Sequence, residues 1–394
     1  MLTACIASVG AAYLPSQRPA PGAPLCGSAR GRAAVRCAEA GTLTQSAVDD
    51  WLGSAVAARG SVASGLLDEV RSEATDVVPP EVREAVLESL REIPEREADP
   101  RTELGCHTFA ALNQAALSDV ACVYVPSGVA VDTLRLILLS TPSYPDSGAE
   151  AGASPQLAAS HPNLSLWLGD GASLSLLQQY AGRGAYFCNG LSRLRLGENA
   201  SLTHAYLQEQ SDGAVHVDSV LATLAAGARY DANIVQSGGR LSRVNLAVRL
   251  EGRHSHASLN GIALGSESQL LDLHSAVRHV SPDCSSEQEQ RNALAGRARV
   301  VFRGAVQVPH GSDNTTANQL CRSLLLSDSA RVDISPNLEI LTDDVVCTHG
   351  ATVADLDDEM VFYLQARGLG RAEARVLLLE GWARSLMGEA MSSI

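Results

Sequence analysis

The sequence predicts a mainly β protein built around a parallel β-helix that is flanked by N-terminal and C-terminal helical segments. Between residues 163 and 355, short runs of alternating apolar and polar residues are separated by Gly, Asp, Asn and Ser. A motif with a central alanine recurs there at intervals of 28, 28 and 29 residues. Aromatic residues make up only 4% of the chain, which suits a narrow solenoid interior lined with small aliphatic side chains.

Alternation is the evidence for strands, because successive side chains of a strand point to opposite faces and one face is buried. It is clearest in the segments 164–168, 244–250 and 300–308. A β-sandwich with accidental spacing would give the same alternation, so the residue pattern alone leaves that alternative open. The recurring motif reads Gly171-Ala172-Ser173, Asn199-Ala200-Ser201, Gly227-Ala228-Arg229 and His256-Ala257-Ser258, with weaker echoes at Ala298, Ala330 and Ala351.

Residues 1–38 have the composition of an organelle-targeting peptide. They contain no Asp or Glu, and they carry Arg18, Arg30, Arg32 and Arg36 among Ser, Ala and Pro. The run 34–38, Ala-Val-Arg-Cys-Ala, resembles a plastid processing site. We therefore interpret residues 1–38 as a plastid transit peptide that directs the protein to the chloroplast stroma, with a mitochondrial address as the alternative.

Residues 39–162 are predicted to form an N-terminal helical region with an exposed loop. Two short strands are expected between residues 122 and 139, and the Pro-, Ser- and Gly-rich stretch 140–162 is typical of a surface loop. The predicted β-helix core then occupies residues 163–355. Within the helical region, Pro80 precedes a stripe of apolar residues at helical spacing, namely Val82, Val86, Leu90 and Ile93.

Residues 356–394 return to a helical pattern. Carboxylates at 357–359 suit a helix N-terminus because they complement the helix dipole, and Gly368 is typical of a helix end. The two predicted helices either cap the solenoid or present a docking face to a partner. The apolar face of the first is predicted to be Met360, Tyr363 and Leu364, and that of the second Ala372, Val376, Leu379, Ala383 and Leu386.

Charge and composition exclude several classes of function. The formal net charge of −14 argues against sequence-independent binding of nucleic acid, and no run of 18 apolar residues predicts a membrane span. All 30 basic residues are arginine. A chain without lysine has neither the phosphate-binding lysine of a Walker A loop nor a Schiff-base nucleophile, so we expect it to bind no nucleotide and any ATP hydrolysis to occur in another chain.

The densest group of chemically active residues is the run 343–352. On a strand, residues i and i+2 share a face, so Cys347 and His349 would present a thiol and an imidazole side by side. Such a pair suits a soft or borderline metal such as iron or zinc. Two ligands cannot close a tetrahedral site, so the others would come from elsewhere in the chain or from another subunit.

Other chemistries have weaker support. Histidines at 254, 256, 274 and 279 precede Cys284, a pattern that fits a metal site but is more typical of surface histidines or of histidines bonded to turns. No G-x-S-x-G elbow is present, and no G-x-G-x-x-G follows a strand and opens a helix. Acidic residues are plentiful, so a stand-alone β-helix enzyme that acts on carbohydrate stays an alternative.

The last third of the chain carries a series of recognisable segments. They are His274-Ser275-Ala276-Val277-Arg278-His279, Cys284-Ser285-Ser286-Glu287-Gln288, the runs 296–304 and 324–327, Pro336-Asn337-Leu338-Glu339-Ile340, the run 343–352 and the run 362–368. Through these segments the sequence resembles the SufB/SufD family of iron–sulfur cluster assembly scaffolds, and within it the plastid-type SufD branch. A SufB-type paralogue is the alternative within the family, but SufB carries a glutamate-bearing run where this chain has Cys347-Thr348-His349.

The resemblance implies a right-handed β-helix and a non-catalytic scaffold. It implies pairing with a SufB-like subunit through the β-helix, binding of the ATPase SufC through the C-terminal helices, and a nascent iron–sulfur cluster or iron shared with SufB. It also implies that His349 is the first candidate ligand and Cys347 the second, with a cysteine and a carboxylate of SufB completing the site. Without SufB, the chain is a candidate for homodimerisation.

Two further sets of residues follow from the resemblance. Cys321 stands where SufB has a functional cysteine; we interpret it chiefly as a buried small residue, and as an extra thiol ligand if it faces the interface. The residues expected to bind SufC are Phe362, Tyr363, Arg367, Leu379 and Trp382.

Overall fold

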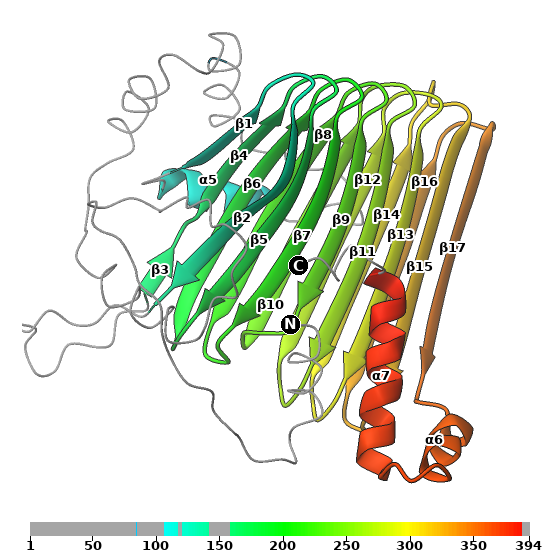
Figure 1. Cartoon of the computed structure of the whole chain (residues 1–394). Helices are drawn as coiled ribbons and strands as arrows, with labels where there is room; N and C mark the ends of the chain where they lie inside the picture. Colours follow the sequence, from blue (N-terminus) through cyan, green and yellow to red (C-terminus); the bar gives the residue numbers. More distant parts are fainter. Residues whose placement is uncertain (1–83, 85–105, 117–119, 142–157, 388–394) are drawn as a thin grey trace, which may run out of the picture.

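The computed structural model of the chain describes Glu84 and residues 106–116, 120–141 and 158–387 (Figure 1). The predicted transit peptide 1–38 lies outside the described residues. So does the helix predicted after Pro80, except for Glu84, which is helical. Most of the loop predicted over 140–162 also lies outside them, although its last part forms a short strand, β3 (Ala158–Ser160).

Two parallel sheets form the body of the molecule (Figure 1). We call them sheet A and sheet B. The strands of sheet A are, in spatial order, β1 (Ala121–Val125), β4 (Asn163–Leu168), β6 (Tyr186–Leu196), β8 (Val215–Leu224), β10 (Leu241–Leu250), β12 (Leu270–His279), β14 (Arg299–Val308) and β16 (Arg331–Ile340), with β3 also pairing with β6. Those of sheet B are β2 (Ala130–Ser140), β5 (Ser173–Gly182), β7 (Ser201–Gln210), β9 (Arg229–Gln236), β11 (His256–Gly265), β13 (Ser285–Leu294), β15 (Thr315–Leu325) and β17 (Val345–Ala354).

From β4 onward, successive strands alternate between the two sheets, and each strand pairs in parallel with the strand two places along the chain. This is the topology of a parallel β-helix, and it removes the β-sandwich alternative, whose hairpins would pair neighbouring strands antiparallel. The predicted fold class is confirmed. The two sheets extend N-terminally of residue 163, because β1 pairs with β4 and β2 with β5.

The recurring alanines mark the turns that lead from sheet A to sheet B. Ala172, Ala200 and Ala228 are each fully buried, and the residues that follow them pair in register along β5, β7 and β9. His256 pairs with Arg229, so Ser255 occupies the position equivalent to Ala228, and Ala257 lies two residues further on. The interval of 29 residues between Ala228 and Ala257 therefore does not join equivalent positions of successive coils.

Two of the weaker echoes belong to the opposite turn. Ala298 and Ala330 both precede strands of sheet A, and Arg299 pairs with Arg331. Ala351 lies within β17. The turn geometry also explains the glycine and asparagine of the motif, because Gly171, Asn199 and Gly227 take φ values of +65°, +55° and +65°, which favour these residue types.

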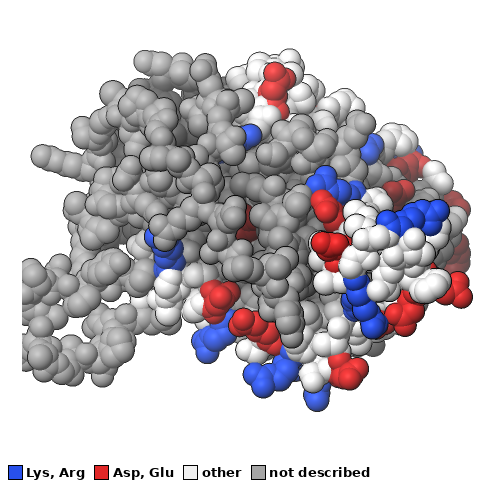
Figure 2. All heavy atoms as spheres, turned by 60° about the horizontal axis from the view of Figure 1, so that its bottom comes forward, with Lys and Arg blue, Asp and Glu red and all other residues white. Residues whose placement is uncertain are grey.

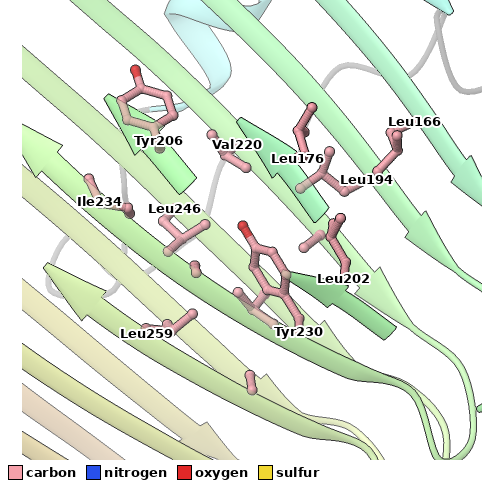
Figure 3. Close-up of a cluster of buried hydrophobic side chains, with 14 of the residues drawn as sticks. Leu166, Leu176, Leu194, Leu202, Tyr206, Val220, Tyr230, Ile234, Leu246 and Leu259 are labelled. Carbon is pink, nitrogen blue, oxygen red and sulfur yellow. The ribbon is translucent and has the colours of Figure 1, made fainter. Parts of the chain in front are cut away.

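Aliphatic side chains from both sheets fill the interior between them. Figure 3 shows side chains from both sheets gathered in one buried cluster, among them Leu176 and Leu202 of sheet B and Leu194 and Leu246 of sheet A. In-register stacking places chemically similar side chains above one another, so each coil extends the same apolar column. Burial of this kind is the main stabilising contribution in a solenoid, where each coil contacts only its neighbours.

The first coils also enclose a polar cluster. Tyr206 Oη donates to Asp218 Oδ2 at 2.9 Å and lies 2.7 Å from His216 Nε2. Burial raises the pKa of Asp218 to about 6, and hydrogen bonds from Tyr180 and Tyr206 oppose that shift. The same burial lowers the pKa of His216 to about 3, so this histidine is neutral at physiological pH.

A helix covers part of the outer face of sheet A. It is α5 (Cys106–Ala115), and its buried Asn113 donates to the carbonyls of Pro162 and Asn189 at 3.0 and 2.7 Å. Asn189 Nδ2 donates in return to the carbonyl of Phe109. These bonds satisfy polar groups that the helix would otherwise bury unpaired, and they fix its position.

The two predicted C-terminal helices are present as α6 (Asp358–Gln365) and α7 (Arg371–Met387). Asp357 caps α6 by accepting a hydrogen bond from the amide of Glu359, and Gly368 follows the helix with a φ of +92°. The predicted apolar face of α6 is wrong, because α6 buries Val361, whereas Met360 and Tyr363 are exposed. In α7, Ala374 is buried in place of the predicted Ala372.

Charged side chains of both signs are interspersed on the described part of the face seen in Figure 2. Some of them bridge successive coils, as in the exposed ion pairs Arg253–Asp283 and Arg299–Asp333. Among the described residues, no helix has the length and apolar character needed to cross a bilayer.

Leu246→Ala tests the packing of the interior. Leu246 is 1% exposed and lies within the main core cluster, so its truncation should leave a cavity and lower the free energy of unfolding by about 2–5 kcal/mol. Urea titration followed by circular dichroism measures this change. Leu377→Ala on the exposed face of α7 is the matched control and should change stability by less than about 0.5 kcal/mol. Equal effects of both changes would contradict the assigned core.

Candidate functional site

The C-terminal end of the solenoid is open. Among the described strands, β16 is the last of sheet A and pairs with β14, and β17 is the last of sheet B and pairs with β15. Each therefore has one edge with no strand beside it, which leaves a row of backbone N–H and C=O groups available for pairing. In Figure 1 these two strands lie at the far end of the molecule from β1.

Cys347 and His349 lie on the interior-facing side of β17. The neighbouring strand β15 directs Ala317, Gln319 and Cys321 into the solenoid, and all three are buried. Cys347 pairs with Ala317, and His349 pairs with Gln319. Paired residues of an in-register parallel sheet point to the same face, so the thiol and the imidazole share the inner face of the last coil. This arrangement agrees with the spacing argument made from the sequence.

No further coil covers this inner face among the described residues. His349 is therefore exposed, and Cys347 is partly exposed. The rim around them is also apolar and exposed. Ile340 and Val353 occupy positions that the preceding coil buries as Val308 and Ser323, whereas Val346 lies on the outer face of β17. The exposed apolar residues of the rim are Ile340, Leu341, Val346 and Val353, with exposed fractions of 37, 46, 62 and 52%.

A polar column lies below His349. Gln319 Nε2 donates to Gln288 Oε1 at 2.9 Å, and Gln288 Nε2 donates to Ser275 Oγ at 2.5 Å. Gly304 on β14 makes room for this column, because a Cβ there would lie 2.1 Å from Gln319 Nε2. The amide oxygen of Gln319 has no hydrogen-bond partner among the described residues, so an acceptor is available next to the position of His349.

The environment of Cys347 keeps its thiol protonated in the free chain. The side chain packs against a small buried cluster of Val306, Val308 and Ala317. Burial raises the pKa of the thiol above its ordinary value, and a backbone hydrogen bond from Ala317 partly opposes this. A soft cation would displace the proton, since metals bind the thiolate.

The two side chains form an incomplete ligand set. Within the described part of the chain, no group of three or more His, Cys, Asp or Glu side chains is arranged to hold a metal ion. A thiol and an imidazole are suitable ligands for iron or zinc, but a tetrahedral site needs two more. The geometry therefore fits a site that is completed by groups other than the described residues of this chain.

Cys321 does not reach this surface. It lies inside the solenoid with no exposed area, and Asn292 Nδ2 donates to its sulfur at 3.4 Å. Burial raises the pKa of its thiol to about 11, with hydrogen bonds from Ser323 and Asn292 opposing the shift. This position agrees with the interpretation as a buried small residue, and any role as a ligand would require the last coil to move.

The upstream histidines are dispersed. His274 is buried on the outer face of sheet A, where its Nε2 lies 2.8 Å from Asp272 and its Nδ1 2.8 Å from Arg243. His279 lies inside the solenoid, 2.9 Å from Ser286 Oγ. His256 contacts Ser285 Oγ at 2.8 Å, and His254 takes a φ of +60° in a turn. These contacts indicate structural roles.

The residues expected to bind the ATPase are not all on the surface. Phe362 and Tyr363 on α6 are 72 and 52% exposed, and Arg367 stacks over the Tyr363 ring at 3.6 Å. Leu379 is buried against the solenoid, and Trp382 packs with the same cluster. The first three are thus available to a partner, whereas the other two lie on the face of α7 that the chain itself covers.

Sequence reasoning missed the polar column under His349. Its signal is present, because Gln288 and Gln290 occupy alternate positions of β13, where an apolar residue would be expected inside a solenoid. Gly304 is a second signal, since a glycine in a strand often marks a close approach. Neither position can be assigned to the inner face without the pairing register.

Fold and site together define a parallel β-helix protein with an accessible thiol and imidazole at the C-terminal end of its described coils. Residues 150–382 match the family described as "SUF system FeS cluster assembly, SufBD core domain". This match spans more than half of the chain, and the chain belongs to the SufBD core family. The resemblance to plastid-type SufD noted in the sequence is thereby supported.

Individual relatives agree. Protein ABCI7, chloroplastic, of Arabidopsis thaliana is 31% identical over 283 residues, which are 71% of this chain and 58% of that protein. An iron–sulfur cluster assembly SufBD family protein of Synechocystis is 29% identical over 72% of this chain and 63% of that protein. SufD of Escherichia coli is 28% identical over 59% of this chain and 56% of that protein. The chain thus spans about three fifths of the length of these relatives.

Thiol accessibility tests the placement of the cysteines. Brief alkylation of the native chain with iodoacetamide, followed by peptide mass analysis, should label Cys122 and Cys347 but not Cys188 or Cys321, which are fully buried. Because the pKa of Cys347 is raised, its labelling should be slow at pH 7 and accelerate as the pH increases. Labelling of Cys321 at the rate of Cys347 would show that the last coil is misplaced, and labelling in denaturant is the control.

Proposed function

We propose that the protein is a scaffold subunit of the SUF iron–sulfur cluster assembly system, without catalytic turnover of its own. It pairs with a SufB-like subunit through the open end of its solenoid. Nascent cluster, or its iron, is held between the two subunits. The family supports the system, and the position of Cys347 and His349 at an open, apolar end supports the mode of pairing.

The observation that supports this proposal most directly is that Cys347 and His349 lie on β17. Among the described strands, β17 pairs only with β15, so its other edge is open. Two strand edges with exposed apolar side chains suit the addition of a partner's strands, because main-chain hydrogen bonds give affinity and side chains give specificity. A partner that seats there would cover His349 and remove water from it. Ligands from that partner would then complete the coordination that two residues cannot supply.

The two ligands have different tasks in this proposal. The imidazole of His349 is exposed and offers a nitrogen ligand to an incoming cation. Cys347 gives up its proton only when a cation is present, which links thiolate formation to the arrival of iron. His349 is therefore the primary ligand and Cys347 the secondary one.

ATP hydrolysis belongs to a SufC-like partner in this proposal, because the chain has no lysine for a phosphate-binding loop. The exposed aromatic side chains of α6 provide its docking face. Exposed aromatic residues near an arginine are typical of interface hot spots. Residues 1–38 and the chloroplastic relative support action in the plastid stroma.

His349→Ala tests the site. After reconstitution with SufB-like and SufC-like partners under anaerobic conditions, the complex should still assemble, because the His349 side chain is not part of the core. Cluster yield measured by absorption and Mössbauer spectroscopy should fall by more than the roughly 10–100-fold typical of losing a supporting group. Thr348→Ala, on the outer face of the same strand, is the matched control and should retain the yield. A normal yield in His349→Ala would remove this residue from the site.

Phe362→Asp tests the docking face. Replacing an exposed aromatic anchor by a carboxylate should weaken binding of the SufC-like ATPase by about 2 kcal/mol or more, roughly thirtyfold. Isothermal titration calorimetry measures the affinity. Leu112→Asp makes a similar change on α5, where the side chain is 43% exposed, and should not alter it. Unchanged affinity in Phe362→Asp would place the ATPase elsewhere.

A further inference from the structure

The polar column ends in an acceptor that the described chain does not use. Gln288 uses both ends of its amide, because it accepts from Gln319 Nε2 at 2.9 Å and donates to Ser275 Oγ at 2.5 Å. Gln319 Oε1, in contrast, has no hydrogen-bond partner among the described residues, although the Gln319 side chain is only 2% exposed. A buried acceptor of this kind has lost its hydration and gained no donor in return, which is unfavourable.

Strand register places this acceptor in the same column as His349. Gln288 of β13 pairs with Gln319 of β15, and Gln319 pairs with His349 of β17. The two coils before them have Ala232 and Leu259 at the equivalent positions, so a polar run begins at Gln288 and leads to His349. Paired residues of a parallel sheet point to the same face from strands about 5 Å apart. The amide of Gln319 is therefore the nearest interior side chain of β15 to the imidazole.

The opposite sheet leaves room for the Gln319 amide at one position. A Cβ on Gly304 of β14 would lie 2.1 Å from Gln319 Nε2 and 2.8 Å from its Cδ, so a larger residue would displace the amide. Ser275 and Pro336 occupy the equivalent positions in the coils before and after Gly304. Of these three positions, the one that lacks a side chain is the one that faces Gln319. The sequence of β14 therefore accommodates this glutamine.

We propose that Gln319 is the positioning residue of His349. Its Oε1 accepts the ring N–H of the imidazole when His349 binds a cation, and the other ring nitrogen then carries the lone pair that faces the open end. This inference rests on the proposed function for the role of His349 as a ligand. Ligating histidines almost always donate their other N–H to a carbonyl, a carboxylate or water, which fixes the tautomer and makes the ligand more basic. Gln319 supplies such a carbonyl.

The same hydrogen bond removes two unfavourable groups at once. In the free chain His349 is exposed, so water hydrates its ring nitrogens. A subunit that seats on the open end would exclude this water, and the imidazole N–H would then need an acceptor from protein. Gln319 Oε1 already needs a donor. Because the bond from Gln319 Nε2 to Gln288 holds the amide in place, little ordering is required when the new bond forms.

Binding of Zn²⁺ to the isolated full chain tests the proposal. Isothermal titration calorimetry of the reduced, metal-free protein measures the affinity, and His349→Ala defines the part of it that depends on the imidazole. Gln319→Met retains much of the side-chain volume and removes the acceptor, so it should weaken the His349-dependent binding by about tenfold or more. Gln319→Glu retains an acceptor at the same place and should restore most of the affinity.

Gln290→Met is the matched control. Gln290 is also buried on β13, its Nε2 donates to Asn292 Oδ1 at 2.7 Å, and its Oε1 also has no hydrogen-bond partner among the described residues. Its column continues through Cys321 to Ala351 and does not contain His349. Gln290→Met should therefore leave the Zn²⁺ affinity unchanged. A loss equal to that of Gln319→Met would show that a loosened interior lowers the affinity, and would overturn the positioning role.

Nitrogen NMR of the histidine ring separates positioning from packing. With Zn²⁺ bound, the ring N–H of His349 should be observable in the wild-type chain and in Gln319→Glu, because a bond to a buried acceptor slows its exchange with water. It should be lost in Gln319→Met, and its absence in His349→Ala assigns the signal. Gly304→Ala displaces the amide of Gln319 without removing it. This variant should give the same loss and serves if Gln319→Met does not fold.

The outcomes distinguish the two proposals. Equal Zn²⁺ affinity of the wild-type chain and His349→Ala would overturn the ligand role on which the proposed function depends. Weaker binding by His349→Ala together with wild-type affinity in Gln319→Met would overturn the positioning role of Gln319 and leave the proposed function intact.

Discussion

The in-register stacking of parallel strands is the constraint on which the rest of the structure depends. Because every coil places its residues directly above those of the coil before, a position is either inside or outside for the whole length of the solenoid. The columns of Leu, Ala and Val that fill the interior follow from this rule. So do the buried alanines at the turns. A slip by one residue would reverse every side chain of a strand, so the pairing is strongly specified.

The same rule produces the candidate site. The last coil continues the columns, but no further coil covers it among the described residues, so positions that are buried elsewhere become surface. Most interior columns would offer only aliphatic groups there. Two of the interior columns instead end at Cys347 and His349 of β17. The column that ends at His349 contains hydrogen-bonded glutamine side chains in the preceding coils. The thiol and the imidazole therefore lie on a surface that continues the interior of the solenoid and has exposed apolar residues around it.

Much of this was accessible from the sequence, since alternation and the alanine spacing reflect local chain geometry. The pairing of Cys347 with His349 on one face followed from strand periodicity. The sequence could not reveal facts that depend on the register between coils, such as the two-residue offset between Ala257 and the equivalent position Ser255, or the burial of Cys321. The exposed face of α6 was also missed, because helical spacing alone does not tell which side meets α7 and which meets solvent.

The edges of β16 and β17 that have no neighbouring strand among the described residues have a consequence for the supply of the protein in the cell. An exposed edge with apolar side chains is an aggregation hazard until another chain covers it. Under the proposed pairing, a copy made in excess of its SufB-like partner has this hazard for as long as it remains alone. Balanced synthesis of the subunits, or prompt degradation of orphans, therefore becomes a requirement of this architecture.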